Sequence, residues 1–334
     1  MKIGLAASLN GAGHFGRILA IGEMLLKRNH SVSLVVGERQ IGLDTERIRN
    51  FEASKNSEVF VISNPLGLEG PQWGVPSSQN PESIPNAVRR AFGGADFVIS
   101  DNSVWPLQIT NKTILMAQFL WLDYWRQNSA DIQTDLEKEE AFLCEKAQVR
   151  LAIPIFQIKS SVVPESITLP LKLFSYPRDA LIARKPVTRE IWVAGGTTGL
   201  NSVTEKFPAT LPDGFKVVSR ETFHLSDFGY RPAAIAGRPG LGSIRDALGS
   251  GVPFLPLWGG EDFELEHNSR ALADWNLVWS DWSRSSVAGL NRPTLENDLV
   301  GLRQSISNFV ESEFVTLDQA VNQILETAER ALHD

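Results

Sequence analysis

The fold is decided by the stretch AGRPGLGSIRDAL at residues 236–248, which is followed closely by GVP at 251–253. This stretch predicts the end of a buried strand over 233–236, a glycine-rich turn, and a helix that begins near Ser243. A helix start presents unpaired N–H groups and the positive end of the helix dipole, which can bind a diphosphate without a lysine. Arg238 could add a charged contact. Alternatively, the glycines only let the helix pack close to the sheet, and the stretch alone leaves both interpretations open.

The composition limits the class of protein. With 334 residues, of which 43% are apolar and 21% charged, the chain is long enough for two globular domains. A net charge of −7 and the lack of any basic run argue against a nucleic-acid partner. The single cysteine, Cys144, excludes a disulfide framework and suits a cytoplasmic protein. No apolar run approaches the roughly 20 residues of a transmembrane segment.

The first part of the chain opens as an α/β domain. We expect a strand at 2–8, a glycine-rich turn at 10–17, a helix at 18–27 and a second strand at 31–36, which together form a β-α-β unit. The glycines do not follow the Gly-x-Gly-x-x-Gly pattern, and no acidic residue ends the second strand cleanly. A dinucleotide site is therefore disfavoured.

The pattern restarts after an irregular stretch at 164–189, which we interpret as ending in an interdomain linker. A strand at 190–194 leads into a second glycine-rich turn at 195–199. Two α/β halves that open alike suggest a ligand in a cleft between them.

The remaining pattern predicts further elements and one long loop. The strand at 96–101 brings Asp101 to its carboxyl end, where α/β proteins place their ligands. The loop at 64–85 and the aromatic segment at 119–125 could line an acceptor site. Other strands are expected at 59–63, 113–119, 151–155, 215–219, 252–257 and 277–279, and helices at 84–92, 135–146, 262–275, 295–309 and 317–332.

Four short motifs carry a resemblance to a known family. They are Gly13-His14-Phe15-Gly16-Arg17, Gly195-Gly196-Thr197-Thr198-Gly199, the opening stretch, and Gly260-Glu261-Asp262-Phe263-Glu264-Leu265-Glu266-His267-Asn268. Over most of its length the chain resembles the GT-B nucleotide-sugar glycosyltransferases, especially the bacterial enzymes that add N-acetylglucosamine to lipid-linked muramoyl-pentapeptide. The resemblance implies an α/β fold with two Rossmann-like doubly wound domains that face each other across a cleft. It implies an acceptor-binding domain at 1–185, a nucleotide-sugar-binding domain at 186–315, and a C-terminal helix at 316–334 that could return to the first domain.

The resemblance also implies a donor site. Asp246 falls where the family has a glutamate that hydrogen-bonds both ribose hydroxyls, and Glu264 falls where a side chain holds hydroxyls of the donor sugar. Leu265 replaces the expected glutamine, which leaves the identity of the sugar open. Arg17 pairs either with a carboxylate or with phosphate. The expected donor-binding residues are Gly13, Arg17, Gly196, Thr197, Phe223, Arg238, Gly240, Leu241, Gly242, Ser243, Asp246, Glu261 and Glu264.

His14 and Asp101 are the expected catalytic pair, because in related transferases a histidine in the first glycine turn is the general base and an aspartate after the fourth strand orients it. A neutral imidazole can accept the proton of an attacking hydroxyl, and a carboxylate fixes its tautomer. The alternatives are a structural histidine and an aspartate that caps the next helix. Glycine N–H groups would stabilise the leaving diphosphate, so neither a metal nor another cofactor is expected.

The function that the resemblance implies is a metal-independent, inverting transfer of a hexose or N-acetylhexosamine to an alcohol. The donor is a nucleoside diphosphate sugar, and the nucleotide is expected to be UDP. The expected partners are the nucleotide sugar and a small-molecule, glycan or lipid-linked acceptor. Nucleotide-sugar hydrolysis or 2-epimerisation on the same fold, and nucleotide-sugar binding without catalysis, stay open as alternatives.

Overall fold

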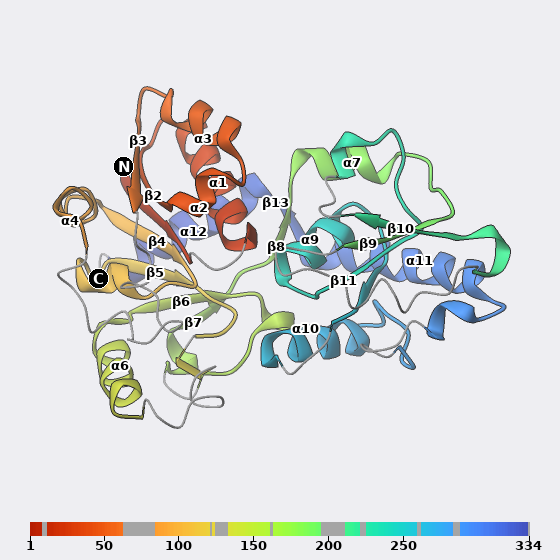
Figure 1. The fold of residues 1–334 in the computed structure, drawn as a ribbon. Coiled ribbons are helices and arrows are strands. Elements are labelled where there is room, and N and C mark those ends of the chain that lie inside the picture. Colours follow the sequence, from red (N-terminus) through yellow and green to blue (C-terminus); the bar gives the residue numbers. More distant parts are fainter. Residues whose placement is uncertain are drawn as a thin grey trace. The chain divides into compact units, whose positions relative to one another are not determined.

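A computed structural model describes residues 1–8, 12–62, 84–120, 122–123, 133–160, 163–194, 211–220, 225–258, 262–282 and 288–332. The chain forms two compact units (Figure 1). The first unit combines Met1–Leu171 with Asp318–Asp334, and the second unit is Lys172–Leu317. The first domain was expected to extend to residue 185, but residues 172–185 fall in the second unit. The strand at 173–175 pairs there with a strand at 314–316.

The first unit contains a seven-stranded sheet in which every neighbouring pair is parallel. Its order is β3-β2-β1-β4-β5-β6-β7, so the chain builds outward from β1 in one direction and then from β4 in the other. This reversal between β1 and β4 is the kind of switch point at which doubly wound sheets bind ligands. The strands are β1 (Lys2–Ala7), β2 (Ser31–Gly37), β3 (Ser57–Ile62), β4 (Phe97–Asp101), β5 (Thr113–Met116), β6 (Val149–Ala152) and β7 (Thr168–Pro170).

Helices cover both faces of this sheet, as two close approaches show. A Cβ added at Gly22 would lie 2.8 Å from Leu5 Cδ1, and one added at Gly4 would lie 2.9 Å from Phe92 Cδ1. Neighbouring residues of a strand face opposite sides, so the helices that carry Gly22 and Phe92 lie on opposite faces of β1. The helices of this unit are α1 (Ala12–Lys27), α2 (Glu38–Ile41), α3 (Thr45–Glu52), α4 (Asn86–Gly93), α6 (Gln133–Lys146) and α12 (Leu317–Leu332), with 3-10 turns η4 (Trp105–Gln108), η6 (Pro154–Phe156) and η7 (Glu165–Ile167).

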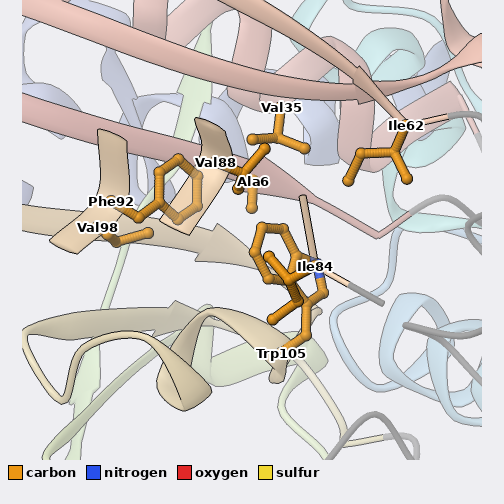
Figure 2. Close-up of a cluster of buried hydrophobic side chains, with 8 residues drawn as sticks. All are labelled: Ala6, Val35, Ile62, Ile84, Val88, Phe92, Val98 and Trp105. Atoms are coloured by element: carbon orange, nitrogen blue, oxygen red, sulfur yellow. The ribbon is translucent and has the colours of Figure 1, made fainter. Parts of the chain in front are cut away.

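An apolar cluster fixes α4 against the sheet (Figure 2). Phe92 stacks on Trp105 with ring centroids 5.5 Å apart and planes only 9° from parallel. Both side chains are buried, and Val98 of β4 belongs to the same cluster. Because Trp105 lies just beyond the end of β4, this packing holds the segment that follows Asp101 against the sheet.

The last helix of the chain lies in the first unit. Arg28 donates hydrogen bonds to the Asp318 carboxylate and to Asn322 Oδ1, and Gln323 Nε2 donates to the Pro170 carbonyl. These contacts tie α12 to the end of α1 and to β7.

The second unit contains a smaller parallel sheet in the order β10-β9-β11-β12, and a separate parallel pair of β13 with β8. The buried Trp192 and Ile235 lie in its two central strands. The strands are β8 (Leu173–Ser175), β9 (Glu190–Ala194), β10 (Lys216–Arg220), β11 (Ala234–Gly237), β12 (Phe254–Pro256) and β13 (Phe314–Thr316). The helices are α7 (Pro177–Ala183), α9 (Leu241–Gly249), α10 (Phe263–Asp274) and α11 (Leu295–Glu313), with 3-10 turns η9 (Pro212–Gly214), η10 (Leu225–Asp227) and η11 (Ala288–Asn291).

Three local expectations were wrong. Helix α1 begins at Ala12 and not at 18, because its buried spacing already starts at Phe15. The expected strand at 277–279 is absent, since Asn276 takes a left-handed φ of 55° and the Leu277 N–H donates to the Leu272 carbonyl, which closes α10. The stretch at 164–189 is not irregular but holds β7, β8 and α7. Most of the loop at 64–85, part of the aromatic segment and the turn at 195–199 lie outside the described residues.

Candidate active site

Two elements that leave the switch point of the first sheet bring the expected catalytic pair together. Asp101 is the last residue of β4 and is fully buried, and the Ser8 N–H donates to its carbonyl at 2.7 Å. His14 lies in the first turn of α1, which follows β1, and β1 pairs with β4. The sequence thus placed both residues at one sheet edge, although His14 lies on a helix and not in a turn.

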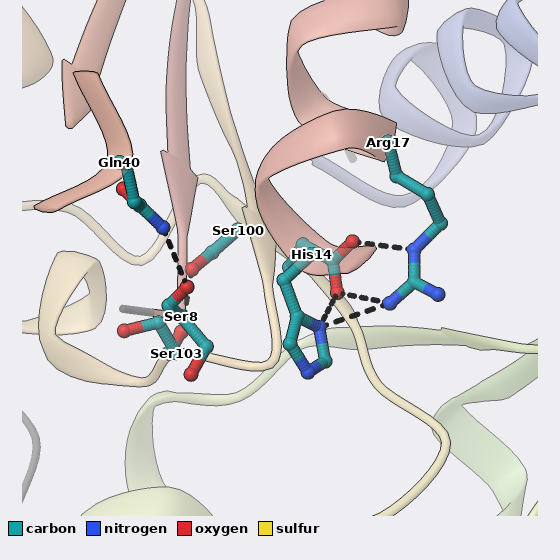
Figure 3. A network of polar contacts seen from close by, with 7 residues as sticks. Ser8, His14, Arg17, Gln40, Ser100 and Ser103 are labelled. Carbon is teal, nitrogen blue, oxygen red and sulfur yellow. Dashed lines mark hydrogen bonds and ion pairs between the residues drawn. The ribbon is translucent and has the colours of Figure 1, made fainter. Parts of the chain in front are cut away.

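The Asp101 carboxylate is the centre of a three-residue network (Figure 3). Arg17 donates from Nε to Oδ2 at 2.7 Å and from Nη2 to Oδ1 at 2.8 Å, and His14 Nδ1 lies 2.8 Å from Oδ1. His14 and Arg17 are three residues apart on α1, so both side chains lie on the same face of the helix. Of the two partners expected for Arg17, the structure shows the carboxylate.

Burial alone would raise the pKa of the Asp101 carboxyl, because a charge loses its hydration inside the protein. The charges of Arg17 and His14 and their hydrogen bonds outweigh this effect and hold the pKa below its ordinary value. The group is therefore ionised at neutral pH. The Arg17 guanidinium compensates its charge in a two-pronged pair, the strong geometry for a buried carboxylate.

The network decides which nitrogen of His14 can act as a base. Arg17 Nη2 lies 2.9 Å from Nδ1, so Nδ1 either donates to Asp101 or accepts from Arg17. An ionised carboxylate is the stronger partner and favours the tautomer with the proton on Nδ1. Nε2 then carries the free lone pair, and it points away from the carboxylate (Figure 3). With 18% of its side chain exposed, His14 can accept a proton there.

The same sheet edge carries other buried polar side chains that sequence reasoning missed. Gln40 accepts from the Gly37 N–H and donates to the Ser8 carbonyl, both at 3.0 Å, and Ser100 Oγ donates to the Ser103 carbonyl at 2.5 Å. Asn102 is 3% exposed, and neither polar atom of its amide has a hydrogen-bond partner among the residues that the structure describes. The sequence signal for Ser100 and Asn102 was the polar run at 100–103, which begins in the last two residues of an otherwise apolar strand.

In the second unit, α9 begins in the glycine turn. Gly240 is its N-cap, with no capping side chain, and the Ile244 N–H donates to the Gly240 carbonyl at 3.1 Å. The N–H groups of Leu241, Gly242 and Ser243 precede that first bond and have no carbonyl within the helix. A Cβ added at Gly240 would meet no atom of the described residues within 4 Å. Unpaired N–H groups at a helix start are donors of the kind that can bind a diphosphate.

Other expected donor residues lie near this turn or near α10. Arg238 pairs with Asp262 at 3.3 Å, and Asp262 caps α10 by accepting from the N–H groups of Glu264 and Leu265. The Asp246 carboxylate lies against the guanidinium of Arg245, and 38% of the Asp246 side chain is exposed. Glu264 and Gly13 are half-buried in the first turns of α10 and α1, while Gly196, Thr197, Phe223 and Glu261 lie outside the described residues. The donor roles of all these residues stay predictions.

Two further findings concern the described residues. They contain no group of three or more His, Cys, Asp or Glu side chains that could hold a metal ion. None of the helices described is long and apolar enough to cross a membrane.

No family model and no curated protein matches the sequence. Solved glycosyltransferase structures do resemble the whole chain. Phytolacca americana UGT2, in complex with UDP-2-fluoro-glucose and pterostilbene, is 14% identical with a TM-score of 0.61, and the match covers 98% of each chain. Arabidopsis thaliana UGT89C1 with UDP is 13% identical with a TM-score of 0.61, covering 98% of this chain and 100% of that one. The glycosyltransferase of kitacinnamycin is 15% identical with a TM-score of 0.59, covering 97% and 98%.

These likenesses confirm the predicted fold class, an α/β protein with two parallel sheets of the GT-B type. The closer resemblance to the muramoyl-pentapeptide N-acetylglucosaminyltransferases is not shown by these structures and stays a prediction.

Proposed function

We propose that this protein transfers a sugar from a nucleotide sugar to an alcohol, with His14 as the general base. The observation that supports this most is the network of His14, Asp101 and Arg17 at the switch point of the first sheet in a GT-B fold. A structural histidine would not need an ionised, fully buried carboxylate to orient it.

The chemistry is a single displacement. Nε2 of His14 accepts the proton of the acceptor hydroxyl as the oxygen bonds to the anomeric carbon of the sugar, and the bond from that carbon to the diphosphate breaks with inversion. The Asp101 carboxylate holds Nδ1–H and stabilises the imidazolium that forms. The nucleoside diphosphate leaves with the electron pair of the broken bond.

The second unit supplies the donor contacts. The N–H groups at the start of α9 bind the leaving diphosphate, Asp246 binds the ribose, and Glu264 binds the sugar. We infer a UDP-linked hexose or N-acetylhexosamine as donor, since two of the structures that resemble the chain hold UDP or UDP-2-fluoro-glucose. The acceptor is a small molecule, a glycan or a lipid-linked alcohol, and the single cysteine favours the cytoplasm as the place of reaction.

Thermal stabilisation by nucleotides tests this proposal. A panel of nucleoside diphosphates and nucleotide sugars is added to the wild type and to Asp246→Ala, with Asp274→Ala as a matched control because Asp274 is an exposed aspartate at the end of α10. A ligand at 100 times its dissociation constant adds about 2.7 kcal/mol of stability. We expect UDP or a UDP-sugar to stabilise the wild type and the control, and Asp246→Ala much less. If no member of the panel stabilises the wild type, the proposal is wrong.

A further inference from the structure

Gln40 is a buried residue at the carboxyl edge of the first sheet, and both ends of its amide bind backbone groups (Figure 3). The residue is 2% exposed. Its Oε1 accepts from the Gly37 N–H and its Nε2 donates to the Ser8 carbonyl, each at 3.0 Å. Gly37 is the last residue of β2, and Ser8 directly follows β1. The amide therefore lies between the ends of two neighbouring strands.

The Gln40 amide takes over where the backbone pairing of β1 with β2 stops. In the register of these strands Ser8 would lie opposite Gly37, but the pairing ends two residues earlier, at Ala6 and Val35. A glutamine side chain carries a carbonyl and an N–H donor, as a peptide group does, so it can join two backbone groups that no longer reach each other. The two strand ends are thus connected through Gln40.

On its other side, β1 stays paired with β4 to the end. Ala7 pairs with Asp101, and the Ser8 N–H donates to the Asp101 carbonyl at 2.7 Å. Ser8 is therefore held at its carbonyl by Gln40 and at its N–H by Asp101. The Asp101 carboxylate lies 2.8 Å from Nδ1 of His14, which belongs to the helix that follows β1. Ser8 thus connects Gln40 both to this carboxylate and to the segment that leads to His14.

One end of the amide has a local role that the other end does not share. Oε1 caps the start of α2, because Gly37 is the N-cap of that helix and Gln40 is its third residue. A glutamate serves in the same cap, and its charge suits the positive end of the helix dipole. The Nε2–H group, which binds Ser8, has no part in the cap.

We propose that Gln40 is a positioning residue for the pair of His14 and Asp101. Its Nε2–H holds Ser8 where the Ser8 N–H reaches the Asp101 carbonyl, and this fixes the start of the segment that leads to His14. The inference rests on the proposed function, because a general base must lie within hydrogen-bond reach of the proton that it accepts. Misplacement of a reacting group by about 1 Å can lower a rate by roughly 100-fold.

Two variants and a matched control test this role. Gln40→Met removes both hydrogen bonds at a similar side-chain length. Gln40→Glu keeps an acceptor for the cap but, once ionised, has no proton for Ser8. The control is Thr113→Val: Thr113 is fully buried at the start of β5, at the opposite edge of the same sheet, and its Oγ1 donates to the Thr110 carbonyl at 2.8 Å. Turnover of a UDP-sugar, stabilisation by UDP and the melting temperature without ligand are measured for each protein.

We expect Gln40→Met to lower kcat by roughly 10- to 100-fold. The KM for the UDP-sugar and the stabilisation by UDP should stay as in the wild type, because the proposed donor contacts lie in the second unit. Gln40→Glu should show the same fall where its carboxyl is ionised. Thr113→Val should melt at a lower temperature and keep the kcat of the wild type. If Gln40→Met does not fold, Gln40→Glu carries the same tests, because it keeps the cap.

A double variant separates positioning from general damage. A residue that acts only through His14 has no further effect once the imidazole is gone. His14→Ala combined with Gln40→Met should therefore consume the UDP-sugar at the rate of His14→Ala alone.

The His14 ring provides a readout that needs no substrate. In NMR spectra of the ligand-free protein, the signal of the His14 Nδ1–H reports its hydrogen bond to Asp101. We expect this signal to shift in Gln40→Met and to stay in place in Thr113→Val.

Three results would overturn the inference. The first is a wild-type kcat in Gln40→Met with only a lower melting temperature, which would make Gln40 a helix cap. The others are a further loss of rate when Gln40→Met is added to His14→Ala, and an unchanged His14 signal. If the wild type neither binds UDP nor consumes a UDP-sugar, the proposed function is wrong, and the His14 signal alone then decides whether Gln40 positions the imidazole.

Discussion

Among the described residues, each unit contains a buried ion pair of an aspartate with an arginine, and the pairs Arg17–Asp101 and Arg245–Asp179 differ in kind. In the first unit, Arg17 donates two hydrogen bonds to Asp101, at 2.7 and 2.8 Å. In the second unit, Arg245 reaches Asp179 with a single contact of 3.2 Å. Both carboxyls are buried. Nevertheless the pKa of Asp101 is lowered, whereas burial raises the pKa of Asp179 above its ordinary value because Arg245 and the Tyr176 N–H compensate for it only in part.

The difference follows from what else each arginine contacts. Arg245 lies over the ring of Tyr176, 3.8 Å from its centroid, and beside the carboxylate of Asp246. Asp179 also accepts from the Tyr176 N–H at 2.7 Å, at the start of α7. This pair ties α7 to α9, and its neighbours are the Tyr176 ring and the Asp246 carboxylate and not a histidine. Arg17, by contrast, keeps the Asp101 carboxylate charged beside His14. A charged carboxylate is the partner that can orient an imidazole whose other nitrogen accepts a proton.

The largest difference in stability is expected when each arginine is removed. Arg17→Met leaves an ionised carboxylate buried without its cation, which should lower the free energy of unfolding by about 3–5 kcal/mol. Arg245→Met leaves Asp179, whose pKa is already raised and which can take up a proton, so the loss should be about 1–3 kcal/mol. Denaturant titrations at neutral pH measure both values. Equal losses would mean that the two pairs do not differ as their geometry indicates.

A smaller effect is expected in the pH dependence of stability. Asp101 has a folded pKa below its unfolded value, so its contribution is present above the unfolded pKa and is lost as the pH falls through the folded pKa. Asp179 has the opposite shift, so its contribution is greatest below the unfolded pKa and declines as the pH rises. Each pKa unit corresponds to about 1.4 kcal/mol.

The matched variants Asp101→Asn and Asp179→Asn test these signs. Between about pH 3 and 6 the free energy of unfolding of Asp101→Asn should rise less steeply with pH than that of the wild type, and that of Asp179→Asn more steeply. The slope is compared and not the level, because each variant also changes packing. Parallel curves for all three proteins would contradict the opposite pKa shifts.

The sequence predicted the parts of the site that depend on chain order. Strand 96–101 was expected to end at Asp101, and His14 to follow the first strand, and parallel strands bring those two ends together. Their contact therefore followed from topology. The start of α9 was predicted from its glycines to within two residues, because turn and cap signals are local.

Other parts could not be predicted because they depend on contacts distant in the sequence. The pairing of β8 with β13 joins residues about 140 positions apart, and three-residue strands carry too short a pattern to be recognised. From the sequence, a carboxylate and a phosphate were equally good partners for Arg17, and only the structure shows its hydrogen bond to Asp101. Asn102 was missed because only the structure shows that its amide is buried and unpaired.

The most direct test of whether the network of His14, Asp101 and Arg17 serves catalysis is the turnover of a UDP-sugar by His14→Ala. The control is Asp179→Asn. We expect His14→Ala to lose activity by roughly 10²–10⁴-fold while UDP still stabilises it thermally, because only the base is gone. Asp179→Asn should keep wild-type turnover. If His14→Ala consumes the UDP-sugar at the wild-type rate, His14 is not the base, and the network around Asp101 has a purely structural role.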